Sequence, residues 1–177
     1  MSAVEVVARP EFGKADLEWL TQLRQNKARS TGAPAFTLVF PGATAPVDVV
    51  KHVGATCAAT PRIRFCLRSA IVVPEHKSGW FHVFLVPDEG FSAINRLHDR
   101  LHVGPLACCL SLDFPYIPHL TVASTPEFDK ARTIMASLNA KGLAIGGRID
   151  ALEVQERGAD APRCIAKIPL AHHGFFH

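Results

Sequence analysis

The sequence predicts an α+β fold. Short segments rich in β-forming residues occur both singly and as one hairpin, and amphipathic helical segments lie between them. This mixture favours α+β over a doubly wound parallel sheet. The chain has 177 residues, of which 48% are apolar, so it is long enough to bury a sizeable core. Its length suits one domain, or two small lobes that share one core.

Four segments carry helical patterns. In the first, 15–28, helical spacing relates Leu17, Leu20, Thr21 and Arg24. In the second, 46–59, and the fourth, 127–140, a proline stands at the expected first turn, and Thr125 is the expected N-cap of the fourth. The third helix, 89–102, is amphipathic.

Strands are predicted from β-forming composition and turn residues, at 36–40, 62–73, 80–86, 119–123, 143–156 and 163–170. Pro41-Gly42 is expected to stop the first strand, and the polar segment 74–79 joins the second and third as a hairpin. Residues 106–112 fit either a buried strand or an irregular segment. The pair Gly146-Gly147 indicates a bulge or close packing.

Composition narrows the class of protein. The net charge of +3 is compatible with a phosphate-bearing ligand, but it is far below that of basic tails that bind nucleic acid by charge alone. Five cysteines without a C-x-x-C pair indicate reduced thiols and a cytoplasmic location. His98 and His102 have helical spacing, but no third metal ligand is evident, so no metal site is predicted. With no signal peptide and no bilayer-spanning segment, we expect no membrane partner. We also expect a monomer.

Two short segments repeat one pattern. Residues 35–40 and 119–123 each follow a proline, and each begins with a variable residue, an apolar residue, threonine and two apolar residues. Ala35 and His119 therefore hold equivalent places, about half the chain length apart. This repeat predicts two related halves, each with an equivalent strand.

The repeat has a chemical consequence. Residues i and i+2 of a strand point to the same face, about 6–7 Å apart. His119 therefore projects beside Thr121, and Ala35 projects beside Thr37. If the two strands are neighbours, all four positions line one groove. Imidazole transfers protons near neutral pH, and a hydroxyl donates to a phosphoryl oxygen, so this set suits phosphate chemistry.

The segment 118–122 resembles the H-x-T motif of the two-histidine phosphoesterase superfamily, and 36–41 resembles that family's first motif. The resemblance is to the 2′-5′ RNA ligase-like and cyclic phosphodiesterase group, and it extends over most of the chain. It implies a single bilobed domain over 1–177, with two pseudo-symmetric lobes of antiparallel sheets around a central groove and helices outside.

The resemblance also implies a metal-independent phosphodiesterase or ligase that acts on nucleotide cyclic phosphates or RNA ends without a cofactor. In such proteins one histidine acts as general base and the other protonates the leaving oxygen. Carried over to this chain, His119 is an acid/base residue, and Thr37 and Thr121 contact the phosphate.

The first histidine position of the family motif is occupied by Ala35. Alanine cannot transfer a proton, and the loss of one such group typically costs about 10²–10⁴-fold in rate. Three explanations are compatible with the sequence: an engineered inactive variant, a natural pseudoenzyme that still binds nucleotides or RNA ends, or another histidine that reaches the groove. His82, in the second hairpin strand, is the best candidate for the third.

Further candidate substrate-binding residues are Tyr116, Phe36, Arg64 and His82. Tyr116 could stack on a base, although aromatic side chains at such positions more often serve packing. Arg64 lies in a row of arginines that forms either a phosphate-positioning wall or an ordinary solvated face. A metal-dependent hydrolase that uses the nine histidines is the weakest alternative.

Overall fold

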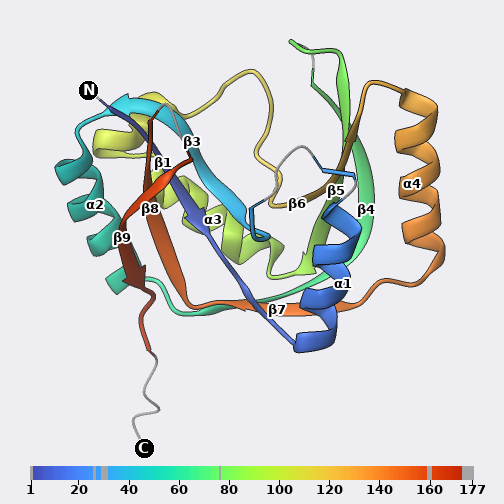
Figure 1. Cartoon of the computed structure of the whole chain (residues 1–177). Coiled ribbons are helices and arrows are strands. Elements are labelled where there is room, and N and C mark those ends of the chain that lie inside the picture. The colour runs from blue at the N-terminus through green and yellow to red at the C-terminus, as the bar shows by residue number, and fades with distance from the viewer. Residues whose placement is uncertain (1, 26, 29–31, 76, 159–160, 173–177) are drawn as a thin grey trace, which may run out of the picture.

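The structure is a computed structural model that describes residues 2–25, 27–28, 32–75, 77–158 and 161–172. Two antiparallel sheets lie side by side with helices around them, as Figure 1 shows. The predicted α+β class is therefore confirmed. None of the described helices is long and apolar enough to cross a membrane.

Sheet A is four-stranded, in the order β3-β1-β8-β9. Its strands are β3 (Phe36–Thr44), β1 (Ser2–Ala8), β8 (Ala151–Arg157) and β9 (Arg163–Pro169). Every neighbouring pair is antiparallel. The strand that carries the first motif, β3, is thus at one edge of sheet A.

Sheet B is five-stranded, in the order β2-β7-β4-β5-β6. Its strands are β2 (Glu11–Phe12), β7 (Ile145–Ile149), β4 (Ile63–Glu75), β5 (Trp80–Glu89) and β6 (Leu120–Thr125). All pairs are antiparallel, and β4 with β5 forms the predicted hairpin. The strand of the second motif, β6, is again at an edge.

The helices lie around the sheets, with α2 and α4 at opposite sides of the molecule and α3 in contact with strands of both sheets (Figure 1). They are α1 (Lys14–Gln25), α2 (Pro46–Ala58), α3 (Phe91–Leu101) and α4 (Phe128–Ala140), with a short 3₁₀ helix, η1 (Gly104–Cys109). Helix α2 packs on β8 and β9 of sheet A, whereas α4 packs on β4, β5 and β6 of sheet B. Helix α1 contacts β6, which places it beside the second motif.

An aromatic cluster joins the two sheets. Phe65 of β4 contacts Phe36 of β3 edge-on, with 5.0 Å between ring centroids, and contacts Phe12 of β2 in the same way at 5.8 Å. A Cβ atom at Gly147 would overlap the Phe65 ring, whereas Gly146 has open space around it. Close packing therefore explains the glycine at position 147.

Several expected elements differ from the structure. The predicted strand 143–156 is two strands, β7 and β8, which belong to different sheets because the chain crosses over at Asp150. The first-motif strand continues past Pro41-Gly42, because an edge strand with an irregular register tolerates proline. Thr125 ends β6 and is not a helix N-cap; the cap position is Glu127, whose N–H donates to the Thr125 hydroxyl at 3.2 Å.

Candidate functional site

The two motif segments occupy equivalent positions in the two sheets. Thr37 pairs with Val7 across β3 and β1, and Thr121 pairs with Phe84 across β6 and β5. Both threonines are half-buried, as is Ala35, which immediately precedes β3. Each motif strand thus presents a half-buried threonine two residues after the position of Ala35 or His119.

Arg24 of α1 holds the two motif segments together. Its Nε donates to the carbonyl oxygen of Thr121 at 3.0 Å, and its Nη1 donates to the carbonyl oxygen of Gly32 at 2.6 Å. One guanidinium group therefore binds the backbone of β6 and the backbone that leads into the first motif. The Arg24 side chain is only 9% exposed, and burial lowers its pKa, with a further decrease from the charge of Arg9.

Sequence reasoning did not identify Arg24 as a site residue, although a signal was present. Arg24 shares its helical stripe with Leu17 and Leu20, and an arginine on the apolar stripe of a helix needs a buried partner. The partners here are backbone carbonyls, which no side-chain motif reveals.

Two further contacts hold the same region. Arg9 bonds Glu153 through Nε at 2.9 Å and donates from Nη1 to the carbonyl oxygen of Ala33 at 3.2 Å, two residues before Ala35. The N–H of Ser124 on β6 donates to the carbonyl oxygen of Lys27 at 2.6 Å. Hydrogen bonds to the carbonyl oxygens of Lys27, Gly32, Ala33 and Thr121 therefore hold this region, and none of them involves the side chain at position 35.

His119 is oriented for proton transfer. Its Nδ1 donates to the carbonyl oxygen of Ile117 at 2.6 Å, so in the neutral ring Nε2 carries the lone pair. No bond to Nε2 is found among the described residues. Burial lowers the pKa of His119 to about 4; the bond to Ile117 opposes this shift, and the charge of His82 adds to it. The ring is therefore neutral at pH 7 and can accept a proton.

Phe84 connects His119 to His82. The rings of Phe84 and His119 are stacked, with centroids 3.6 Å apart and planes 13° apart, and His82 lies nearly parallel to Phe84 at 6.1 Å. Because His82 and Phe84 are two residues apart on β5, both point to one face of sheet B. His82 thus shares that face with His119 and Thr121.

The structure places the other predicted contacts away from His119. Phe36 is fully buried against Phe65, so its ring belongs to the core. Arg64 is exposed and pairs with Arg148 of β7, at the opposite end of β4 from the part that pairs with His82.

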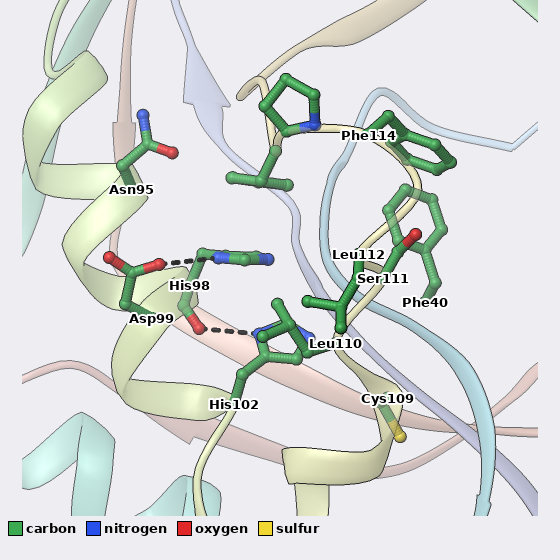
Figure 2. A pocket seen from close by; sticks show the side chains of 12 residues that line it. Phe40, Asn95, His98, Asp99, His102, Cys109, Leu110, Ser111, Leu112 and Phe114 are labelled. Atoms are coloured by element: carbon green, nitrogen blue, oxygen red, sulfur yellow. Dashed lines mark hydrogen bonds and ion pairs between the residues drawn. The ribbon is translucent and has the colours of Figure 1, made fainter.

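Tyr116 lines a separate cavity of about 260 Å³ between α3 and the chain that leads to the second motif. Figure 2 shows Asn95, His98, Asp99 and His102 on one side of the cavity, and on the other Phe40, Cys109, Ser111, Leu112 and Phe114. The Tyr116 ring stacks on His98 with centroids 3.9 Å apart, and its buried hydroxyl has no hydrogen-bond partner among the described residues.

The histidines of this cavity bond to their own helix. Nδ1 of His102 donates to the carbonyl oxygen of His98 at 2.8 Å, and Nδ1 of His98 bonds Asp99 at 3.1 Å (Figure 2). Within the described part of the chain, no three His, Cys, Asp or Glu side chains are arranged to hold a metal ion. The cavity therefore has the character of a small pocket with aromatic and imidazole walls.

Comparisons with known proteins agree on the family. Residues 12–161 match the 2′-5′ RNA ligase superfamily. The structure is similar to E. coli LigT in complex with 3′-AMP, at a TM-score of 0.58 and 12% identity over 97% of this chain and 99% of that one. It is also similar to Kluyveromyces marxianus Usb1, at a TM-score of 0.55 and 9% identity over 96% of this chain and 99% of that one. No curated protein sequence matches the chain.

At these identities the solved structures establish the fold, which is the two-histidine phosphoesterase fold of LigT. The sequence match covers most of the chain, including both motif segments and the helices between them. The chain therefore belongs to the 2′-5′ RNA ligase superfamily.

Proposed function

We propose that this protein is a metal-independent phosphoesterase for nucleotide cyclic phosphates or RNA ends, slowed by Ala35 in the first motif. The observation that carries the proposal is the Arg24 bridge, which holds the two motif segments at one junction. His119 is the acid/base residue, and the hydroxyls of Thr37 and Thr121 donate to phosphoryl oxygens. We propose that the protein works as a single bilobed monomer in the cytoplasm.

The orientation of His119 supports a general-base role. With Nδ1 bonded to Ile117, Nε2 accepts the proton of an attacking water or hydroxyl. A pKa of about 4 keeps the ring unprotonated at neutral pH, so the base form is always available. Ala35 supplies no second proton transfer, and the reaction loses about 10²–10⁴-fold in rate by comparison with a site that has two such groups.

The relatives support the class of ligand. E. coli LigT has been solved with 3′-AMP and with ATP, and Kluyveromyces marxianus Usb1 with uridine monophosphate. These proteins share the fold of this chain and bind nucleotides. A nucleotide phosphate at the motif junction is therefore the ligand to test first.

The decisive experiment is hydrolysis of a 2′,3′-cyclic nucleotide by this chain and by Ala35→His, assayed in parallel with EDTA present. We expect the variant to exceed the unmodified chain by about 10²-fold or more, because it restores a second acid/base group. Thr37→Val and Thr121→Val in the variant should each weaken turnover. If neither protein hydrolyses any cyclic phosphate, the proposal fails.

Ala35 favours a second candidate, a module that binds nucleotides or RNA ends without turnover. It predicts calorimetric binding of 3′-AMP by the unmodified chain, weakened by His119→Ala, Thr37→Val and Thr121→Val, with no product formed. The absence of binding to any nucleotide would remove this alternative.

A further inference from the structure

A β-bulge changes which residues of β6 face the motif residues. Phe84 of β5 pairs with Thr121, and His82 pairs with Ser124. An interval of two residues on β5 therefore corresponds to an interval of three residues on β6. Val122 is the extra residue. Strict alternation would put Thr121 and Ser124 on opposite faces, but the bulge brings both onto the face of His82 and Phe84.

The bulge also shortens the distance between the two hydroxyl residues along the strand. Thr121 and Ser124 are separated by the same length as Phe84 and His82, which is about 6–7 Å for two residues of a strand. Two hydroxyls at this spacing can contact opposite sides of one phosphate ester. His119 stacks on Phe84, on the same face.

Ser124 begins a hydrogen-bonded chain across this face. Its Oγ lies 2.9 Å from Nδ1 of His82, and Nε2 of His82 lies 3.2 Å from Oε2 of Glu75. A carboxylate only accepts hydrogen bonds, so Nε2 of His82 carries a proton. In the neutral ring Nδ1 is then an acceptor, and the Ser124 hydroxyl donates to it. When both ring nitrogens of His82 carry a proton, Nδ1 donates to the Ser124 oxygen. The Ser124 hydroxyl can then donate its own proton to another group.

We propose that Ser124, His82 and Glu75 form a proton relay that replaces part of the rate contribution of the missing acid/base group of the first motif, so that Ala35→His still raises turnover. This inference rests on the proposed phosphoesterase function. Three other histidines in the described part of the chain are engaged elsewhere: His52 bonds the carbonyl oxygen of Leu101, and His98 and His102 line the α3 cavity.

The proposed reaction is the hydrolysis of a 2′,3′-cyclic phosphate by water. Water attacks phosphorus and gives a proton to Nε2 of His119, and the bond from phosphorus to one ribose oxygen breaks. That oxygen takes the Ser124 hydroxyl proton, and Nδ1 of protonated His82 replaces it on Ser124. His119 gains one proton and His82 loses one, so no co-reactant is needed. The Glu75 carboxylate accepts a hydrogen bond from Nε2 of His82 and so orients the ring, with Nδ1 toward Ser124.

The test compares the same substitutions in two backgrounds, the unmodified chain and Ala35→His. We expect His82→Gln and Ser124→Ala to lower kcat on a 2′,3′-cyclic nucleotide by about 10²-fold or more in the unmodified chain. In the Ala35→His background the loss should be within about three-fold, because a second histidine is then available. Ser124→Thr keeps a hydroxyl and should retain most of the turnover.

Ser78→Ala is the matched control. Its hydroxyl donates to the same Glu75 oxygen at 2.5 Å but not to His82, so its loss should leave kcat unchanged in both backgrounds. Circular dichroism checks that each variant is folded. Equal losses in both backgrounds would mean a structural role and would overturn the relay. So would an inactive unmodified chain beside an active Ala35→His variant, which leaves the proposed function standing. Inactivity of both proteins overturns the proposed function and the relay together.

Discussion

The two motif strands have the same structural setting, but they differ in the residue at the histidine position of the motif. Each is an edge strand, each follows a buried proline, and each presents a half-buried threonine. The second strand begins with His119, whose tautomer is fixed by Ile117 and whose ring stacks on Phe84. The first begins after Ala35, which has no group to orient. The placement of the two strands therefore does not depend on a side chain at position 35 that can transfer a proton.

The reason for this independence lies in the backbone contacts. Arg24 and Arg9 bind carbonyl oxygens at Gly32, Ala33 and Thr121, and none of these bonds involves a motif side chain. A substitution at position 35 therefore changes chemistry without removing the bonds that place the strands. The predictions below test that separation.

Loss of His119 should have the largest effect. In the Ala35→His background, His119→Ala should lower kcat by about 10²–10⁴-fold, because one of two proton-transfer groups is removed. Thermal unfolding should show that the variant remains folded, since the bonds of Arg24 to the backbone are intact. Unchanged turnover would show that the two halves do not share one site. The exposed His172 provides a control, because His172→Ala should leave kcat unaffected.

Loss of Arg24 should instead lower the free energy of unfolding. Arg24→Met removes two hydrogen bonds from a charged donor and leaves two carbonyls unsatisfied, which we expect to cost about 3–5 kcal/mol in the free energy of unfolding. Urea denaturation measures this change. Arg132→Met is the control, because Arg132 is exposed with a single 3.5 Å ion pair, and such pairs contribute about 0–1 kcal/mol. Similar small losses in both variants would contradict the bridging role of Arg24.

The helices and the hairpin followed from the sequence, because their apolar periodicity and turn residues are local signals. The N-terminal strand β1 was not anticipated, although it lies in the interior of sheet A. Its residues Val4, Val6 and Ala8 alternate with others that are also buried, so the segment lacks a clear polar face. The split between β7 and β8 was missed for a related reason: no proline or glycine marks Asp150.

From the sequence alone the two motif segments are recognisable as a repeat, and alternation along a strand places His119 beside Thr121. That Ser124 also lies on this face could not be predicted, because the β6 bulge depends on pairing with β5 and breaks the alternation that sequence reasoning assumes. Arg24 was equally hidden, since its partners are main-chain atoms. Contacts between segments that are distant in the sequence, and not local sequence patterns, determine the surroundings of Ser124 and Arg24.

His119, which precedes the second motif strand, should also make the free energy of unfolding depend on pH. The pKa of His119 is about 4 in the folded protein, whereas a solvent-exposed histidine has a pKa of about 6.5, so the unfolded chain binds the proton more tightly. This contribution to stability is complete above pH 6.5, decreases as the pH falls, and levels off below about pH 4, with a total of roughly 3 kcal/mol. Urea unfolding of the unmodified chain and His119→Gln across this range should give a difference that changes with pH. Parallel curves would contradict the shift.

The smallest expected effect concerns the first strand, through the aromatic cluster. Gly147→Ala would force the Phe65 ring to move, and Phe65 packs on Phe36 of β3, between Ala35 and Thr37. Overpacking of this kind costs about 1–3 kcal/mol. Gly146→Ala is a matched control in the same strand, because a Cβ there meets no atom within 4 Å and reduces the freedom of the unfolded chain. Thermal unfolding should therefore show a lowered Tm for Gly147→Ala and not for Gly146→Ala. In the Ala35→His background, Gly147→Ala should also lower turnover, because Thr37 shifts. Equal Tm values for the two variants would show that Phe65 yields without disturbing β3.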